Sequence, residues 1–210
     1  MSKLRFLIVM IVFAGCSHPV FFKGVQSTVT YSDRLQAKVG LYLPDELKSY
    51  HLEVAASGNT CSGHSFPMDI GKTFTDALQV GVRTASLDVV VLTTPPNVQT
   101  MQSQGIKFVV MPTVTNADGD VSFSTGFWSA GIKANFQTSF TFNLMGDDGR
   151  TFYSFSSNGA GFSTGTGGCG DGAEVMSKAA GSAIQQVTDN LAQTLNSAVQ
   201  VRDYVKSSSH

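Results

Sequence analysis

The sequence is poor in charge. Asp, Glu, Lys and Arg make up 14% of its 210 residues, against about 25% in an average globular domain. The formal net charge is −1 and basic residues form no block, which excludes the basic surface that nucleic-acid binding requires. Long apolar runs are missing as well. The run at residues 6–13 is far shorter than the roughly 20 residues that cross a bilayer.

Metal-ligating residues are also few. The chain has four histidines and three cysteines, and no His-x-x-x-His or Cys-x-x-Cys spacing occurs. Zinc sites are usually built from such closely spaced ligands. We therefore expect no metal and no cofactor. His18, His51 and His64 are each expected to be solvated or to make a single hydrogen bond.

What the sequence does contain is an export signal at its start. Lys3 and Arg5 precede the apolar run, and Ala14-Gly15 supplies the small residues that a signal peptidase needs. Cys16 follows at once. The tetrapeptide Phe13-Ala14-Gly15-Cys16 resembles the lipobox of bacterial lipoproteins, with Phe13 where Leu is usual. The alternatives are an uncleaved membrane helix and ordinary secretion. The apolar run is too short for a membrane helix, and an ordinary secretion signal requires no cysteine.

The lipobox resemblance implies a domain organisation and a location. Residues 1–15 are then a signal peptide, residues 16–35 a lipid-anchored segment, residues 36–206 a single domain, and residues 207–210 a disordered tail. In this family the cysteine carries a diacylglycerol and its new amino terminus is acylated, which holds a protein firmly to a membrane. Ser17 is not the Asp that favours inner-membrane retention. The resemblance therefore implies the periplasmic face of the bacterial outer membrane.

Cysteine pairing follows from the same location. With Cys16 lipidated, Cys61 and Cys169 remain, and the periplasm is an oxidising compartment. We expect a Cys61–Cys169 disulfide, with two buried free thiols as the alternative. Closing a loop of about a hundred residues stabilises a fold by roughly 4–5 kcal/mol in the chain-entropy description.

Hydrophobic periodicity predicts strands and two helices. Apolar and polar residues alternate over residues 132–144, which is typical of a strand with one buried face. Asp147-Asp148-Gly149 is a hairpin turn signal after it. Helical spacing predicts helices at about residues 69–84, capped by Asp69, and at about 173–201. The order of elements predicts an α+β fold of two layers: an antiparallel twisted sheet with both helices packed on one face.

Turn residues predict several connections. Residues 36–43 and 51–55 are expected to form a hairpin around Pro44, and residues 116–120 (Asn-Ala-Asp-Gly-Asp) another turn. The glycine-rich segment 159–172 is expected to be a flexible loop.

Two catalytic motifs occur in that glycine-rich segment. Gly161-Phe-Ser163-Thr-Gly165 has the spelling of a nucleophile elbow, which requires a strand before the serine, a helix directly after it and a later histidine base. Residues 165–170 have the spelling Gly-x-Gly-x-x-Gly, which binds a dinucleotide only when a further parallel strand follows its helix. The sequence shows neither context. We therefore expect no enzyme activity and no nucleotide.

Aromatic residues are abundant, with 15 phenylalanines. We expect most of them in the core, while Phe127 and Trp128, at a strand end, are candidates for an exposed contact with lipid or a partner. In architecture the chain is similar to small outer-membrane lipoproteins of envelope-assembly and transport systems. This resemblance implies a non-enzymatic binding or scaffold lipoprotein whose partners are the membrane and other envelope proteins or further copies of itself. The alternative is a lipid- or glycan-binding lipoprotein that uses an aromatic sheet face.

Overall fold

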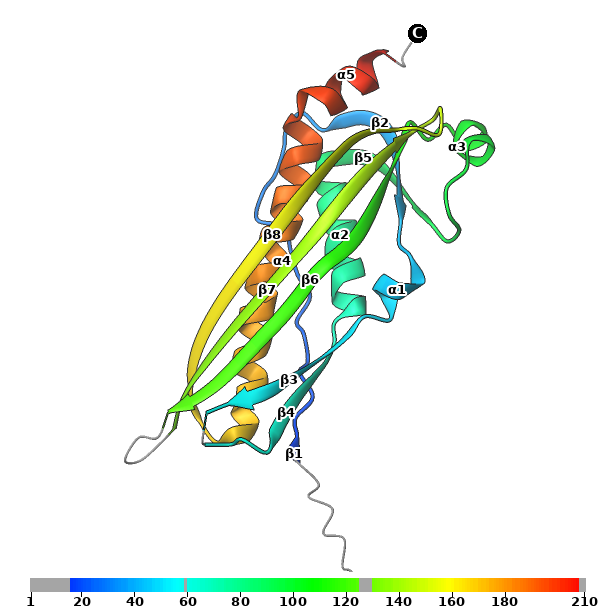
Figure 1. Ribbon diagram of the computed structural model, residues 1–210. Coiled ribbons are helices and arrows are strands. Elements are labelled where there is room, and N and C mark those ends of the chain that lie inside the picture. Colours follow the sequence, from blue (N-terminus) through cyan, green and yellow to red (C-terminus); the bar gives the residue numbers. More distant parts are fainter. Residues whose placement is uncertain (1–15, 59, 125–129, 208–210) are drawn as a thin grey trace, which may run out of the picture.

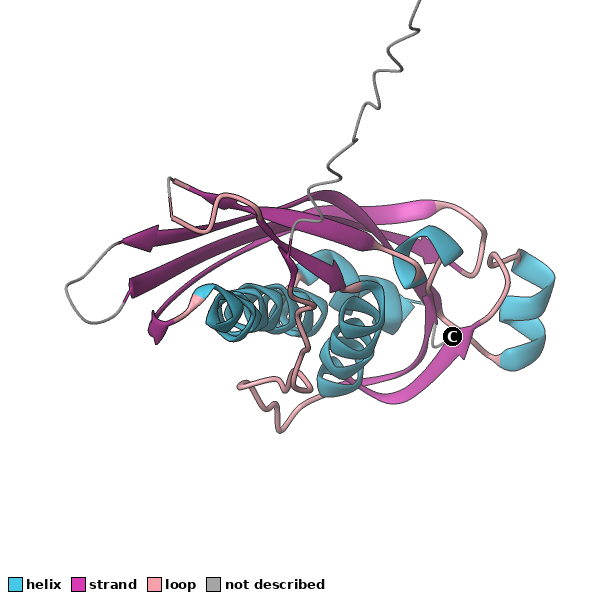
Figure 2. Cartoon of the chain, turned by 90° about the horizontal axis from the view of Figure 1, so that it is seen from below, coloured by secondary structure: helices cyan, strands magenta, loops and turns pink. Residues whose placement is uncertain are grey.

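A twisted sheet carries helices on one face (Figures 1 and 2). The computed structural model describes residues 16–58, 60–124 and 130–207. The strands are β1 (Cys16–Ser17), β2 (Leu35–Tyr42), β3 (His51–Ser57), β4 (His64–Asp69), β5 (Ser86–Leu92), β6 (Phe108–Ser124), β7 (Ala130–Gly146) and β8 (Thr151–Gly167). The helices are α1 (Asp45–Lys48), α2 (Gly71–Ala85), α3 (Val98–Gln104), the 3₁₀ turn η1 (Cys169–Asp171), α4 (Gly172–Ser197) and α5 (Val199–Ser207). The predicted α+β class is confirmed.

Strand β6 is the centre of the sheet. It pairs antiparallel with β7 over its whole length, and β7 pairs antiparallel with β8. On its other side, β6 pairs in parallel with β2 at residues 108–110 and with β3 at residues 121–122. Outside these lie β5 next to β2, and β4 then β1 next to β3. The sheet is therefore mixed. The expected hairpin of residues 36–43 and 51–55 is wrong, because these two strands pair with opposite ends of β6.

Strand β7 confirms the period-two pattern that predicted it. Ile132, Ala134 and Phe136 are at most 1% exposed, whereas Lys133 and Asn135 between them face solvent. The hairpin turn after β7 is also confirmed, with Gly149 at a φ of 80°, a conformation that favours glycine. The turn expected at residues 116–120 is wrong. Strand β6 continues through it, with a register shift between Val114 and Asn116 that accommodates the irregular sequence as a bulge.

The glycine-rich segment is a strand and not a flexible loop. Strand β8 continues to Gly167 and lies directly under α4 (Figure 1). A Cβ atom on Gly159 or Gly161 would fall well inside 3.0 Å of a carbonyl oxygen of α4. Glycine at these positions therefore lets the helix backbone rest on the strand backbone. Ala179 and Ala183 complete this close contact on the helix side, and both are fully buried.

Helices α2 and α4 lie side by side and run in the same direction along the sheet (Figure 1). They approach closely at Gly81, where a Cβ atom would lie 3.0 Å from the carbonyl oxygen of Thr188. The predicted cap is wrong: Asp69 ends β4, and α2 begins two residues later without a side-chain cap. The predicted helix at 173–201 is interrupted at Ala198: α4 ends at Ser197 and α5 begins at Val199.

Aromatic rings fill the space between the sheet and the helices. Phe136, Phe140 and Phe142 of β7 are at most 1% exposed. Phe74 of α2 meets Phe140 edge to face with 5.0 Å between the ring centroids, a favourable aromatic geometry. The aromatic sheet face is therefore core, as expected for most of these residues. These three rings are therefore not exposed to a ligand.

Candidate functional site at the N-terminal strap

Cys16, the predicted lipidation site, is exposed and already belongs to the sheet. It is the first residue of β1 and lies opposite His64 in the parallel pair with β4. The backbone N–H groups of His18 and Val20 continue this ladder, each donating to a β4 carbonyl oxygen at 2.9 Å. Val20 is 5% exposed and belongs to the hydrophobic core. The described chain is thus ordered against the domain from Cys16 onwards.

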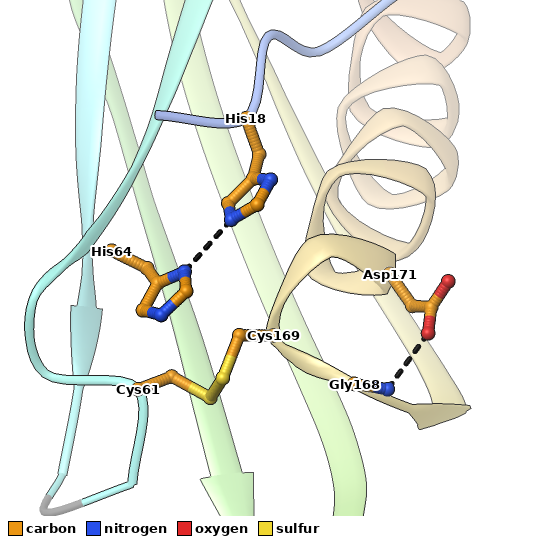
Figure 3. Close-up of a disulfide and its surroundings, with 6 residues drawn as sticks. All are labelled: His18, Cys61, His64, Gly168, Cys169 and Asp171. Atoms are coloured by element: carbon orange, nitrogen blue, oxygen red, sulfur yellow. Dashed lines mark hydrogen bonds between the residues drawn. A yellow bond between two sulfur atoms is a disulfide. The ribbon is translucent and has the colours of Figure 1, made fainter. Parts of the chain in front are cut away.

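His18 and His64 form a hydrogen-bonded pair beside this entry point (Figure 3). His18 Nε2 and His64 Nδ1 lie 2.7 Å apart, and the two rings stack with centroids 5.0 Å apart. One imidazole donates and the other accepts, because an N–H···N bond needs one of each. His18 also stacks on Phe66 of β4. Elsewhere on β3 and β4, His51 Nδ1 lies 2.9 Å from the carboxylate of Asp69.

A disulfide joins Cys61 and Cys169, as predicted (Figure 3). It links residues 108 positions apart, with Cα atoms separated by 5.7 Å. It fastens the loop before β4 to η1, where α4 begins. In the same turn, the Asp171 carboxylate accepts a 2.7 Å hydrogen bond from the N–H of Gly168. The start of α4 is therefore fixed from both sides at the end of the domain that carries Cys16.

Residues 18–34, here called the strap, run along α4 towards α5 (Figure 1). The strap contacts the helices at three places. Ser177 Oγ donates to the Phe21 carbonyl at 2.6 Å, and Arg202 pairs with Asp33 at 2.9 Å. Between them, the Asp189 carboxylate accepts hydrogen bonds from the Ser27 and Thr28 hydroxyls and from the Thr28 N–H. The strap is thus attached to the helical layer near its beginning, middle and end.

A groove of about 930 Å³ lies between the strap and α4. This strap groove is lined by strap residues 19, 21 and 23–26 and by an outer row of α4 that includes Ala173, Ser177 and Gly181. Phe21 lines it with 80% of its surface exposed. A Cβ atom on Gly181 would meet no other atom within 4 Å, so the space above the helix is open there. A smaller hollow of about 330 Å³ lies on the other side of residues 19–22.

Charges of both signs surround the strap groove. Lys23 contributes from the strap, and Asp171, Glu174 and Lys178 contribute from the helical side. Lys178 Nζ lies 2.7 Å from the Glu174 carboxylate. The hydrogen bond and charge of Lys178, together with the charge of Lys23, lower the pKa of Glu174. This carboxylate is therefore ionised at neutral pH, and the rim carries both cations and anions.

The other residues singled out in the sequence lie elsewhere. Phe127 and Trp128 are outside the described residues. Ser163 lies within β8, opposite Ala134 of β7, and so occupies a continuous strand instead of the strand-to-helix turn of a nucleophile elbow. Across residues 16–58, 60–124 and 130–207 there is no cluster of three or more metal-ligating side chains, and no helix among them is long and apolar enough to cross a membrane.

The strap groove and the histidine pair were not predicted. Both are formed by segments that are far apart in the sequence: the groove joins residues 19–26 to residues 170–185, and the histidines are 46 positions apart. The available signal was the apolar character of Val20-Phe21-Phe22, which is unusual for a tether.

Neither a protein-family model nor a curated protein matches this chain. Solved structures that it resembles include a neuraminyllactose-binding hemagglutinin homolog from Helicobacter pylori, with 13% identity, a TM-score of 0.47, and 89% of this chain and 99% of that chain covered. The PelC dodecamer from Paraburkholderia phytofirmans has 19% identity and a TM-score of 0.32, with 80% and 95% covered. A minor lipoprotein from Acinetobacter baumannii has 11% identity and a TM-score of 0.36, with 79% and 94% covered.

Proposed function

We propose that this protein is a lipid-anchored, non-enzymatic binding or scaffold component of the bacterial cell envelope. Cys16 carries the anchor and holds the domain at the periplasmic face of the outer membrane. Its partners are the membrane itself and another envelope protein or a second copy of this chain. The observation that carries the proposal is the position of Cys16, which is exposed and is the first residue of the β1–β4 pair.

An anchor at this position would leave no tether between the membrane and the domain. Cys16 already pairs with His64 of β4, and the buried Val20 is only four residues away. The end of the sheet with the disulfide would then lie close to the lipid headgroups. The opposite end, with α3 and the β7–β8 turn, would point away from Cys16 (Figure 1). A domain held in this way presents a constant surface to a partner, which suits a scaffold.

The placement of the motif residues supports a non-enzymatic role. Ser163, the serine of the elbow-like motif, lies within the continuous strand β8. Asp147, one of two adjacent aspartates in the turn after β7, accepts a 2.8 Å hydrogen bond from the Tyr204 hydroxyl. That bond joins α5 to the turn region after β7, so the carboxylate has a structural partner.

Replacing the cysteine tests the anchor. Cys16→Ser should abolish incorporation of labelled palmitate and leave soluble protein or an uncleaved precursor. Ser17→Ala is the matched control and should fractionate like the unmodified protein. Ser17→Asp should move the acylated protein to the inner-membrane fraction, which tests the outer-membrane assignment separately. A Cys16→Ser protein that is still processed and membrane-bound would contradict the proposal.

Crosslinking in intact cells tests the binding role. A photoreactive residue in place of the exposed Gln102 of α3 would probe the end far from Cys16. A crosslink to an envelope protein or to a second copy of the chain is the expected result. A chain that remains monomeric and uncrosslinked at several such positions would contradict a scaffold function.

A further inference from the structure

The strap groove is an open space between the strap and α4. The strap touches α4 at Ser177 and again at Asp189, twelve residues and about 18 Å further along the helix. Between these two contacts Val25 packs against the hydrophobic core, and the strap and α4 both line the groove. Gly181 lies in this part of α4 and has no neighbour near its Cβ position, so the helix presents bare backbone to the groove.

The groove has an apolar part and a polar part. Its apolar and small lining residues include Phe21, Val25, Ala173 and Gly181. A ring as large as that of Phe21 gains a few kilocalories per mole, about 1.5–3, when it leaves water. In this chain Phe21 lines the groove and remains 80% exposed. A flexible hydrocarbon chain would cover the ring and the apolar part of the groove at once.

The rim of the groove limits the headgroup that such a chain could carry. Lys23 extends from the strap, and Asp171 lies at the start of α4. Glu174 and Lys178 neutralise one another as an ion pair. A purely anionic or purely cationic ligand would meet one unfavourable neighbour here, whereas a phosphate joined to an ammonium group finds a partner of opposite sign for each charge.

The position of Cys16 identifies the source of the ligand. Phe21 is five residues from Cys16 along an extended segment, which corresponds to about 17 Å. In a domain anchored at Cys16, Phe21 therefore lies within about 17 Å of the lipid headgroups. We propose that the strap groove binds one acyl chain of a zwitterionic phospholipid from the anchoring membrane, with Phe21 covering that chain. This inference rests on the proposed function.

Fluorescence quenching by brominated lipid tests the site. The chain has one tryptophan, so Trp128→Phe combined with Phe21→Trp places a single reporter in the groove. Trp128→Phe combined with Phe162→Trp is the matched reporter, because Phe162 is 60% exposed but lies on β8, outside the strap groove. Each lipidated protein is reconstituted in phosphatidylcholine vesicles brominated in the middle of one acyl chain. We expect strong quenching of the first reporter and little of the second.

Filling the groove supplies the decisive comparison. Gly181→Leu places a side chain in open space and also improves helix propensity, so the fold is retained. It should lower lipid occupancy at the first reporter by about tenfold or more, a change of about 1.4 kcal/mol. Gln193→Leu adds the same side chain to an exposed position of α4 outside the groove and should leave quenching unchanged. Vesicles of brominated phosphatidylglycerol should quench less than those of phosphatidylcholine.

The outcomes separate this site from the anchor. Absence of quenching at the Phe21→Trp reporter overturns the inference, and so does quenching that Gly181→Leu leaves intact, because the ring would then insert into the bilayer without a groove. The same variants carrying Cys16→Ser are tested with added vesicles. Quenching without palmitate labelling of the Cys16 protein would refute the anchor and retain the lipid site. Labelling without quenching would retain the anchor and refute the lipid site.

Discussion

Gly161→Ala should destabilise the protein by about 3 kcal/mol. The added methyl group would lie well inside 3.0 Å of the carbonyl oxygen of Ala179 and close to the backbone nitrogen of Ala183. Both atoms belong to the backbone of α4, which cannot rotate away as a side chain could. The helix must therefore shift by about an ångström along a contact where Ala179, Ala183 and Val187 are at most 1% exposed. Overpacking of this kind costs about 1–3 kcal/mol. We expect the upper end of this range because the atoms that the methyl group meets belong to the backbone of α4.

Urea unfolding followed by circular dichroism measures this effect. With a slope of about 2 kcal/mol per molar urea, the midpoint should fall by about 1.5 M. Gly181→Ala is the matched control, because its methyl group meets nothing within 4 Å and Ala is the better helix former. It should raise stability by about 0.5–1 kcal/mol. A Gly161→Ala midpoint indistinguishable from that of the unmodified protein would refute the argument that glycine is needed for the contact between β8 and α4.

Three further predictions concern the disulfide, the α5 contact and the strap. Replacing Cys61 and Cys169 together with Ala should lower stability by about 4–5 kcal/mol in unfolding experiments, because the long loop is released; a loss below about 1 kcal/mol would contradict this. Burial and the hydrogen bond to Asp147 raise the pKa of Tyr204 to about 12. The unfolded chain therefore releases this proton at a lower pH than the folded protein does. The free energy of unfolding should fall as pH rises from about 10 to about 12. Tyr204→Phe should remove that decline in pH-dependent unfolding, and a decline of equal size in the variant would assign it to other groups. Asp189→Ala removes the carboxylate that holds the middle of the strap. Hydrogen exchange in the strap and trypsin cleavage after Lys23 should then accelerate by about tenfold. Unchanged rates would show that the strap does not depend on this contact.

Strand β7 and helices α2 and α4 could be predicted because their signals are local. The alternation over residues 132–144 requires one buried face, whatever the partner strands are. The rows of apolar residues on α2 and α4 require a covering layer in the same way. The Cys61–Cys169 pair followed from the predicted compartment and from the count of cysteines. None of these inferences requires knowledge of which distant segments contact one another in the folded protein.

The strand pairings and the glycine-rich segment could not be predicted in this way. Both β2 and β3 pair with β6, and nothing within residues 36–57 distinguishes that arrangement from a hairpin. Gly159 and Gly161 indicate flexibility when read alone. In the folded protein the same residues are ordered, because the backbone of α4 can approach β8 only where side chains are missing.

The sequence by itself determined the pairing of Cys61 with Cys169 and the elements with strong periodicity, because each depends on neighbouring residues or on composition. It also predicts the export signal that ends at Cys16. Only the tertiary structure decided the order of the strands, the ordered state of β8, and the attachment of residues 16–34 to the domain. The strap groove also depends on the tertiary structure, because it exists only where residues 19–26 lie beside α4. Contacts between distant segments set these features, and the free energy of such contacts is absent from any single stretch of the chain.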